Sequence, residues 1–502
     1  VWFDGLNRYY LAAERMDLRE GLSLAPNIFD RYISYDQKIS ADYFLASVRE
    51  DDAIHFRRSA NRPKLAYCSP MPPDASGIAY YACHVLDDLA LRYDITVVTT
   101  SGSTTEPGVA SKFRVIGFSE FHSALSEYER IMYHIGNNAS FHASMLLLLA
   151  HRRATLVLHD TFVGDLLAYF MQQSLPQEPE RALALPDWLN HTDSAQKLAA
   201  LLFDGYGLGA LLVYRRLGLA ETFRRFPMLS GMLRHAGSVV VHSGHAESEI
   251  RRFGSEQFID RPRLMRTMLP RVPERSLDGK PRGLADVLSR QLDRRSLGLR
   301  ESDFLLVSLG YLRPGKCCQE LLAGFAAFAR EQMAIEGELR ASSGQLRLVF
   351  VGAYSDLADP WSTSFQASVE SLCDEGVQVQ VTGWVSDEDY RSWIGAADVA
   401  VQLRQDSRGE SSGSALDAMA FGLPLVVNRH GSLAELGAAC VLSSLDELPG
   451  ALGRIYLDEA YRLDLSRKSW VWVKDQHSPS MVASAYTRAI EAAARSSDPV
   501  GA

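Results

Sequence analysis

Short apolar segments with the composition of buried strands recur along most of the chain, and helical stretches separate several of them. The first series, which begins after Pro63, comprises residues 65–68, 95–99, 113–118, 130–135, 155–158 and 238–242. The second series comprises residues 304–309, 346–351, 377–382, 399–403, 425–427 and 439–442. Because strands that alternate with helices favour parallel sheets covered on both faces, the pattern predicts an α/β protein with two Rossmann-like, doubly wound domains.

The regions between and around these series set the expected domain limits. Residues 1–60 mix aromatic and charged residues, with helical patterning at 38–48, and we expect an N-terminal extension packed on the first domain. An acceptor or a partner subunit could also bind there. Residues 174–235 are predicted to form a helical insertion. Residues 268–300 are rich in Pro, Arg and Asp and are predicted to form a linker. The predicted divisions are 1–60, 61–270, 271–477 and 478–502, the last holding an Ala-rich helix at 478–495 and a tail.

Composition narrows the class of protein. A chain of 502 residues exceeds one ordinary core, which agrees with two domains. The net charge of −9 disfavours a general nucleic-acid binder, and no apolar run reaches membrane-spanning length. The N-terminus shows no signal-peptide pattern, and the six cysteines lack CxxC spacing, which argues against zinc sites and disulfides. These features predict a cytoplasmic protein with reduced thiols.

The segment 397–436 reads as strand, glycine-containing loop, helix, strand and turn. Glu410 is expected just before the helix N-terminus, and Asp417 about one turn inside the helix. The free N–H groups of a helix N-terminus suit an anion or a sugar hydroxyl. An ordinary βαβ unit with solvated acids remains the alternative. The loop and the first turn supply the candidate ligand-binding residues Arg404, Arg408, Ser412, Gly413 and Ser414.

This segment resembles the donor-binding signature of retaining glycosyltransferase family four, whose fold is GT-B. The matching residues are Ala418, Met419, Gly422 and Pro424. The acids depart from the signature, because Glu410 and Asp417 have six residues between them and Asp replaces the second Glu. The "GESSG" variant with Asp looks like a bacterial polysaccharide subgroup with mannosyl- or rhamnosyltransferase character. The resemblance implies two domains facing a central cleft and a C-terminal helix that crosses back to the first domain.

Two further loops resemble family motifs. The segment 69–78 follows the first strand and matches the loop that lines the donor phosphate and the acceptor side, with Ser76, Gly77 and Ile78 at its end. The segment 309–316 is similar to the diphosphate motif, with Gly310 and Lys316 in place. Each segment could instead be an ordinary turn between strand and helix.

The usual arginine of the diphosphate motif is missing, because Tyr311 occupies its position. A diphosphate leaving group needs positive charge or dipoles to stabilise it. Arg313, Arg404 and Arg408 are the candidates to replace the arginine. Since no DxD motif or metal-binding triad is present, we expect neither a metal nor another cofactor.

Polar side chains follow three strands of the first domain. His134 and Asn137 lie at the end of one strand, His159 and Asp160 at the end of the next, and His242 at the end of a third. Because ligands of open parallel sheets bind beyond the carboxyl ends of strands, these side chains are expected at one cleft, although a single buried histidine is more often structural. His159 matches the family's histidine near the donor sugar. In the second domain, Thr382, Gly383, Trp384 and Val385 match the segment whose backbone contacts the nucleotide base.

Together these resemblances imply a retaining hexosyltransferase that uses a nucleoside-diphosphate sugar, with GDP-mannose favoured. The acceptor would be a glycan or lipid-linked glycan of a bacterial surface polysaccharide such as O-antigen. The implied catalytic residues are Lys316 for the diphosphate, Glu410 for the donor sugar and His159 for positioning, with Asp417 on the ribose. The leaving phosphate would take the acceptor proton, as in the family's favoured front-face mechanism.

Three alternatives stay open at this point. The chain could be a weakly catalytic or non-catalytic sugar-nucleotide-binding partner in a polysaccharide assembly complex. It could be another GT-B enzyme, such as an epimerase or a phosphorylase. An NAD-dependent enzyme ranks low, because no GxGxxG follows either first strand. The arginines between 215 and 234 suggest peripheral contact with the inner face of a membrane, and a solvated charged face is the alternative.

Overall fold

The computed structural model describes most of the chain beyond residue 61. The described residues are 2–3, 8–9, 62–74, 76–149, 151–172, 194–253, 264–276, 281–336 and 344–495. The chain separates into two compact units, Val1–Arg62 and Pro63–Ala502. In the first unit, β1 (Trp2–Phe3) pairs antiparallel with β2 (Arg8–Tyr9). The helical patterning predicted at 38–48 lies outside the described residues.

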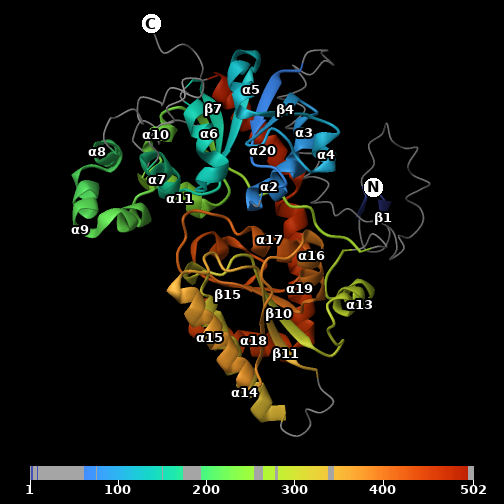
Figure 1. The fold of residues 1–502 in the computed structure, drawn as a ribbon. Helices are drawn as coiled ribbons and strands as arrows, with labels where there is room; N and C mark the ends of the chain where they lie inside the picture. Colours follow the sequence, from blue (N-terminus) through green and yellow to red (C-terminus); the bar gives the residue numbers. More distant parts are fainter. Residues whose placement is uncertain are drawn as a thin grey trace. The chain divides into compact units, whose positions relative to one another are not determined.

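The N-terminal lobe of the second unit is built on a seven-stranded parallel sheet with the order β5-β4-β3-β6-β7-β8-β9 (Figure 1). Its strands are β3 (Lys64–Cys68), β4 (Asp94–Thr99), β5 (Arg114–Gly117), β6 (Arg130–Ile135), β7 (Ala154–Leu158), β8 (Ala236–Val241) and β9 (Leu264–Arg266). The first six confirm the first predicted series. The seventh was not predicted, because three residues at the sheet edge carry too little pattern.

Helices follow most strands of this sheet along the chain. They are α2 (Gly77–Ala82), α3 (Leu86–Leu89), α4 (Pro107–Ala110), α5 (Phe118–Ser123), α6 (Ala139–Leu149), α7 (Gly164–Gln172), α8 (Ser194–Tyr206), α9 (Leu208–Arg225), α10 (Ser230–Leu233) and α11 (Gly244–Phe253). The predicted insertion at 174–235 is helical where it is described, in α8 to α10, and residues 174–193 lie outside the described residues. Among the described residues, no helix has both the length and the apolar character needed to cross a bilayer.

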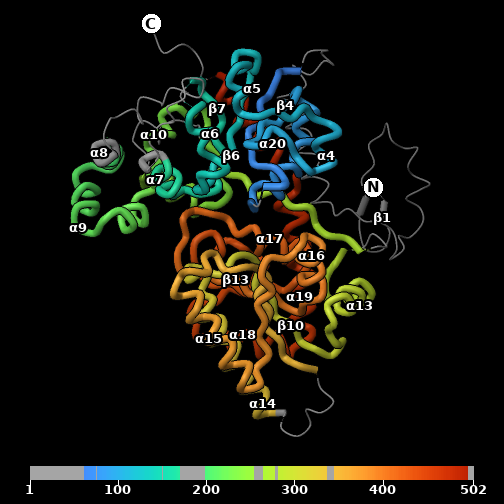
Figure 2. Tube along the Cα trace, viewed as in Figure 1, coloured from blue at the N-terminus to red at the C-terminus, as the bar shows by residue number. Residues whose placement is uncertain are grey.

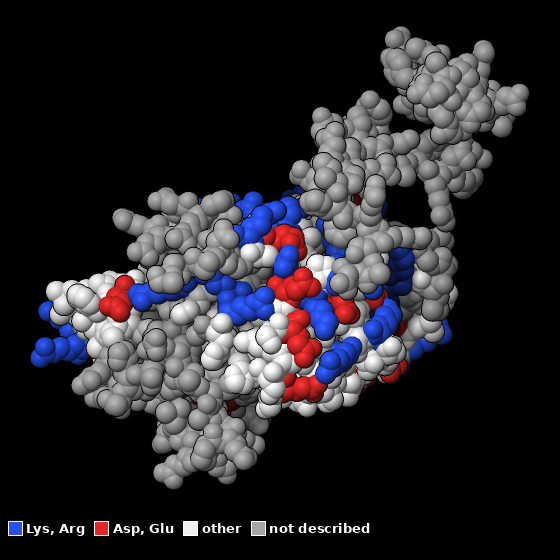
Figure 3. Space-filling view, turned by 90° about the horizontal axis from the view of Figure 1, so that it is seen from above, with Lys and Arg blue, Asp and Glu red and all other residues white. Residues whose placement is uncertain are grey.

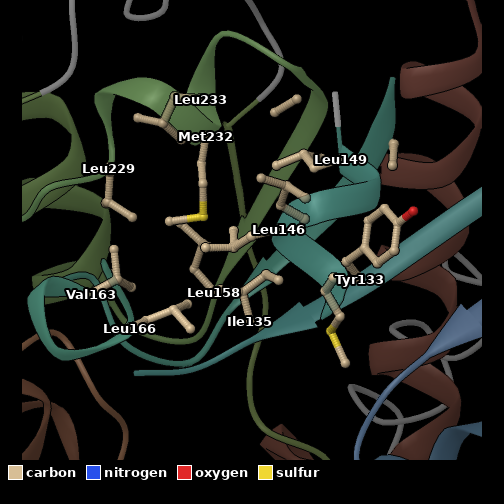
Figure 4. Close-up of a cluster of buried hydrophobic side chains, with 14 of the residues drawn as sticks. Tyr133, Ile135, Leu146, Leu149, Leu158, Val163, Leu166, Leu229, Met232 and Leu233 are labelled. Carbon is tan, nitrogen blue, oxygen red and sulfur yellow. The ribbon is translucent and has the colours of Figure 1, made fainter. Parts of the chain in front are cut away.

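One core of the N-terminal lobe lies between the sheet and the helices α6, α7 and α10. Figure 4 shows Ile135 and Leu158 of the sheet meeting Leu146 of α6 and Met232 of α10. All four side chains are at most 1% exposed. Burial of each such side chain stabilises the fold by about 1.5–3 kcal/mol, so this layer fixes the ends of β6 and β7 from which site residues project.

The C-terminal lobe contains a six-stranded parallel sheet with the order β12-β11-β10-β13-β14-β15. Its strands are β10 (Phe304–Leu309), β11 (Leu346–Val351), β12 (Gln378–Val381), β13 (Val399–Gln402), β14 (Leu425–Asn428) and β15 (Cys440–Leu442). All six confirm the second predicted series. Both lobes therefore have the strand order of a doubly wound Rossmann-like domain, and the predicted fold class is confirmed.

The helices of this lobe lie on both sides of its sheet (Figure 1). They are α13 (Val287–Ser296), α14 (Cys318–Glu336), α15 (Pro360–Asp374), α16 (Asp387–Ala396), α17 (Gly413–Ala420), α18 (Leu448–Leu457) and α19 (Glu459–Gln476). Short 3₁₀ turns occur at η6 (Pro314–Lys316), η8 (Gly431–Glu435) and η9 (Leu445–Glu447).

The prediction of a linker at 268–300 is wrong for its second half, which contains α13. Asp286 caps this helix by accepting a hydrogen bond from the Ser289 N–H at 3.3 Å. Arg290 and Arg294 each donate to Asp398 at 2.7 Å, so the charges attach the helix to the second sheet. The sequence pattern did not show this because the ion-pair partner lies about a hundred residues further along the chain.

The chain returns to the N-terminal lobe through α20 (Pro479–Arg495), as predicted for the last helix. In Figure 2 this red helix lies among the blue and cyan segments of the first sheet. The Ser238 hydroxyl donates to the Ala489 carbonyl at 2.8 Å, and Arg130 forms a 3.0 Å ion pair with Glu491. Tyr486 is fully buried, so the C-terminal helix is part of the N-terminal lobe's core.

Candidate functional site

Both sheets reverse their strand order once, between β3 and β6 in one lobe and between β10 and β13 in the other. Ligands of open parallel sheets bind beyond the carboxyl ends of the strands at such switch points. Two pockets are lined by residues of both lobes, one including His242 and Ser412 and the other including Tyr80 and Asp417. The candidate site therefore comprises the loops that follow these strands.

The loop after β13 touches the N-terminal lobe directly. The carbonyl oxygen of Arg408 accepts hydrogen bonds from the backbone N–H of Thr161 at 2.7 Å and from its hydroxyl at 2.9 Å. The Ser411 hydroxyl donates to the His242 carbonyl at 3.3 Å. Gly409 has φ of +79°, and a Cβ there would lie 2.0 Å from the Thr161 hydroxyl, so only glycine allows this approach.

Three basic side chains, Lys316, Arg404 and Arg313, lie close together near the end of β10. Gly310 has φ of +89°, and a Cβ there would lie 2.7 Å from the Nζ of Lys316. The ammonium donates to the Leu309 carbonyl at 3.1 Å. Burial lowers the pKa of Lys316 well below its ordinary value, and the charges of Arg404 and Arg313 lower it further. Because burial and repulsion disfavour the charged form of Lys316 in the free protein, a bound anion would stabilise the protonated lysine.

The structure separates the three arginines that were expected to replace the missing one. Arg404 is 7% exposed and donates to the Ser412 hydroxyl at 3.4 Å. Arg404 and Arg313 both lie close enough to Lys316 to affect its pKa. Arg408 instead forms a 3.1 Å ion pair with Asp165 of α7. No group of three or more His, Cys, Asp or Glu among the described residues is arranged to hold a metal ion.

The residue at the position of the missing arginine belongs to an aromatic surface. The ring of Tyr311 lies 5.7 Å from that of Trp384, and both side chains are exposed. Gly383, with φ of +73°, and Thr382 place Trp384 beyond the end of β12, while Val385 packs on the core. Exposed aromatic faces can stack on a nucleobase. Tyr311 is therefore placed with the predicted base-binding segment and not with the cations.

The helix N-terminus predicted from the sequence is present at α17. The Ser412 hydroxyl accepts a hydrogen bond from the Ala415 N–H at 3.3 Å, which makes Ser412 the N-cap, and Gly413 is the first helical residue. The Ser414 hydroxyl donates to the side-chain oxygen of Gln402 at 3.3 Å. A helix N-terminus of this kind can bind an anion or hydroxyl oxygens through backbone N–H groups that have no partner within the helix.

Glu410 lies two residues before this cap, as predicted. One carboxylate oxygen accepts a hydrogen bond from the Arg408 N–H at 2.6 Å, and the other lies 3.9 Å from the Nε of Arg404. The Glu410 carbonyl accepts from the Ser432 hydroxyl at 2.7 Å, so the turn after β14 holds its backbone. The carboxylate is thus oriented and retains free lone pairs for a ligand hydroxyl.

Asp417 occupies the predicted position within α17, and its partners were not predicted. Arg271 donates from Nε to one carboxylate oxygen at 2.8 Å, and the Tyr390 hydroxyl donates to the other at 3.2 Å. The Arg271 guanidinium also lies 4.9 Å from the Tyr81 ring, and its backbone N–H donates to the His477 carbonyl. No local pattern singles out Arg271, because it lies in the predicted linker.

The three histidines at strand ends meet in one stack, as expected from the parallel sheet. The rings of His134 and His159 are 5.2 Å apart, and those of His159 and His242 are 5.0 Å apart. His159 bonds through one ring nitrogen to the Tyr81 hydroxyl at 2.6 Å and through the other to His134 at 3.0 Å. Both nitrogens of His159 are therefore engaged within the protein, and neither is free for a sugar hydroxyl in this arrangement.

Burial keeps this stack uncharged. Desolvation lowers the pKa of His134 and of His159 well below the ordinary value, and it lowers the pKa of His242 to about 4. Neighbouring rings add to the shift in His134 and His159, since two adjacent imidazolium ions would repel each other. At neutral pH the stack thus supplies shape and hydrogen bonds and no positive charge.

The remaining polar residues of the N-terminal lobe lie together at the ends of β6 and β7. The Asn137 N–H donates to the Asp160 carboxylate at 2.8 Å, and its side chain bonds to Asp165 at 2.7 Å and to the Leu166 N–H at 3.1 Å. A Cβ at Gly136 would lie 3.3 Å from the Asp160 carboxylate and 2.9 Å from a histidine ring, so a larger residue there would displace these side chains. Asn137 thus connects the carboxyl end of the sheet to α7 through hydrogen bonds.

Replacement of Asp160 by Asn is expected to stabilise the fold at pH 8 by about 2–3 kcal/mol. Burial, with the nearby Glu410 carboxylate, raises the pKa of Asp160 to about 6. A raised carboxyl pKa means that its contribution to stability is present below pH 3.8 and is lost as the pH rises to about 6. Urea unfolding should therefore show a gain for Asp160→Asn at pH 8 that disappears at pH 4, whereas the exposed Asp94→Asn should show neither. An equal gain at both pH values would contradict the assignment.

The loop after β3 reaches the C-terminal lobe. The Ser76 hydroxyl accepts from the Ile78 N–H at 3.2 Å and caps α2, with Gly77 exposed as its first residue. Ile78 and Tyr81 pack against the core of the C-terminal lobe. The helix that follows the predicted first loop therefore lies beside α17, which carries Asp417, and this brings candidate residues of both lobes into one region.

Comparison with known proteins adds a family match for part of the chain. Residues 324–455 match the family model described as glycosyl transferases group 1. This range includes Glu410 and Asp417 and excludes Lys316 and the N-terminal lobe. No curated protein matches the chain by sequence.

Solved structures match over most of the chain. HepE of Anabaena, in complex with UDP and glucose, covers 86% of this chain and is itself covered completely, with 12% identity and a TM-score of 0.54. WaaG, a glycosyltransferase involved in lipopolysaccharide biosynthesis, covers 85%, with 98% of its own chain matched, at 14% identity and a TM-score of 0.52. Sucrose-phosphate synthase of Thermosynechococcus elongatus gives the same coverage at 16% identity and a TM-score of 0.54. The chain therefore has the GT-B fold, with a segment of its C-terminal lobe matching glycosyl transferases group 1.

Proposed function

We propose that this protein is a glycosyltransferase that moves a sugar from a nucleoside-diphosphate sugar to a hydroxyl of a glycan or lipid-linked glycan. The observation that carries the proposal is the pair of desolvated cations Lys316 and Arg404, with the exposed Arg313 beside them, in the loops after β10 and β13. A diphosphate leaving group develops negative charge, and preorganised cations lower its energy most where water is excluded. The matched family segment and the GT-B neighbours support the same reading.

The residues around the three cations indicate where the base, the ribose and the sugar of the donor would bind. We propose that the Tyr311 and Trp384 rings face the base and that Asp417, oriented by Arg271, accepts from the ribose hydroxyls. Glu410 and the N–H groups at Gly413 would hold the donor sugar. Since two of the four lone-pair positions of Asp417 are used by protein donors, the others remain for a ribose.

We propose retention at the anomeric carbon, with the leaving phosphate accepting the acceptor proton. The family resemblance supports this choice. His159 would act as a positioning residue through the chain Tyr81–His159–His134, because its ring nitrogens are both engaged. Proton NMR of the product distinguishes the two stereochemical outcomes, and an inverted linkage would overturn this part of the proposal.

A second candidate is a sugar-nucleotide-binding partner without strong transferase activity. The displaced acid spacing and Tyr311 favour it, because both depart from the family's donor site. Another GT-B enzyme, such as an epimerase, would also bind the donor but would not transfer its sugar to an acceptor.

The test has two stages. The first is thermal unfolding with GDP-, UDP-, dTDP- and ADP-sugars, since a ligand of the native state raises the melting temperature by mass action. GDP-mannose is the predicted donor. UDP-sugars are tested alongside it, because HepE binds UDP and glucose. The stabilising donor is then used to measure transfer.

In the transfer assay, Glu410→Gln is expected to lower kcat/KM by about 10²-fold while the melting temperature stays unchanged. The exposed Glu331→Gln on α14 is the matched control. Donor binding without transfer in the unsubstituted protein would favour the binding-partner candidate, and absence of any donor binding would overturn both.

A further inference from the structure

An exposed apolar surface lies on α8 and the first half of α9. Phe203 of α8 is 56% exposed, and Leu208 and Leu212 of α9 are 62% and 44% exposed. Large apolar side chains in such a local group mark a contact surface more often than chance exposure does.

The spacing along α9 aligns apolar and basic residues on one helical face. Leu208, Leu212, Arg215 and Arg216 follow at intervals of four, three and one, which places them on the same side of the helix. All four are exposed. Gly218, with φ of +79°, ends this straight segment before the second half of α9 begins.

The charge of this surface is opposite to that of the whole chain. From Phe203 to the end of α9 there are four arginines and two acids, whereas the chain carries a net charge of −9. Glu221 pairs with Arg224 at 2.7 Å and with Arg225 at 2.5 Å, which leaves Arg215 and Arg216 as the excess charge. Figure 3 shows blue side chains beside white surface at the left end, the side on which Figure 1 places α8 and α9.

We propose that the exposed face of α8 and α9 docks on the surface of a bilayer that contains anionic lipid. Leucine and phenylalanine side chains that enter the boundary of the acyl chains, with arginines beside them at the headgroups, are the combination that binds such a surface. Acidic lipid headgroups attract each arginine, so the local positive charge favours an anionic bilayer. Docking here requires no catalysis and therefore stands independently of the proposed function.

The experiment is vesicle flotation of the full chain, with phosphatidylcholine alone and with phosphatidylcholine containing 40% phosphatidylglycerol (about the anionic fraction at which surface attraction is strong). Binding is expected only to the anionic vesicles and should weaken with added salt. Arg215→Gln with Arg216→Gln should lower the apparent affinity by about tenfold or more. Leu208→Ser with Leu212→Ser should lower it by about the same factor at every salt concentration.

Matched controls come from exposed residues of the C-terminal lobe. Leu357→Ser with Leu457→Ser removes two leucines that are 73% and 71% exposed, and Arg295→Gln with Arg300→Gln removes two exposed arginines. Neither control should change flotation. Equal losses in the controls, or no binding to anionic vesicles, would overturn the proposal. Vesicle-independent self-association that the Leu208→Ser, Leu212→Ser variant abolishes would assign the surface to a second copy instead.

Transfer to a soluble acceptor should be unchanged in both α9 variants. A loss of flotation with intact transfer therefore supports docking, while absence of transfer in every form of the protein would bear on the proposed function alone.

Discussion

Replacement of Lys316 by Met is expected to lower kcat/KM for sugar transfer by about 10²–10³-fold without lowering the stability of the fold. The ammonium is held beside Arg404 and Arg313, and burial together with these charges lowers its pKa well below the ordinary value. Such a group destabilises the free protein and is stabilised when a diphosphate binds. Loss of function with equal or greater stability is therefore the expected signature of a ligand-binding cation, and a structural lysine would not give it.

The same reasoning predicts a pH effect with a defined sign. Because the folded-state pKa of Lys316 is depressed, its contribution to stability is present above the unfolded pKa of about 10.5 and is lost as the pH falls. Stability of the unsubstituted protein should thus rise between neutral pH and pH 10, and Lys316→Met should reduce this slope. Nucleotide binding should also take up protons, which calorimetry in buffers of different ionisation enthalpy detects.

Lys468→Met is the control, because this lysine is exposed and pairs only with Asp464 on the surface of α19. It should leave transfer, the pH slope and the proton uptake unchanged. If Lys316→Met retained transfer while Lys468→Met behaved identically, the cationic group would not be the diphosphate site.

The strands could be predicted because their signal is local. A buried parallel strand needs a short apolar run, and β10 and β13 show one within their own residues. Loop positions such as Glu410 before α17 could be predicted for the same reason, since a helix start has a local pattern. β9 was missed because three partly exposed residues at an edge do not differ from a loop.

The partners of the site residues could not be predicted, because they are distant in sequence. Arg271 meets Asp417 across 146 residues, and the arginines of α13 meet Asp398 across about a hundred. Charged residues in a Pro-rich stretch predict a solvated linker, because their ion-pair partners are not known before the fold is. The stack of histidines was expected at one edge, but only the structure shows that both nitrogens of His159 are engaged.

Acidification is expected to unfold the protein above pH 4, because several buried histidines must accept protons. Burial lowers the pKa of His142 and His242 to about 4, and it lowers the pKa of His134 and His159 well below the ordinary value. Groups with depressed pKa values contribute stability that is present above the unfolded pKa of about 6.5 and is lost as the pH falls through the folded pKa. His142 and His242 each contribute on the order of 3 kcal/mol, against a total stability of about 5–15 kcal/mol for a typical domain.

Asp160 acts in the opposite direction, since its raised pKa stabilises the fold in acid, but one carboxyl group offsets only about one histidine. Urea unfolding at pH 7, 5.5 and 4.5 measures the slope. His142 donates from Nδ1 to the His134 carbonyl at 3.0 Å, and Asn can reproduce this donor. His142→Asn should therefore lower the pH slope by about one proton, whereas the exposed His122→Asn should not change it. A slope in the unsubstituted protein that His142→Asn leaves intact would show that the buried histidines do not control acid unfolding.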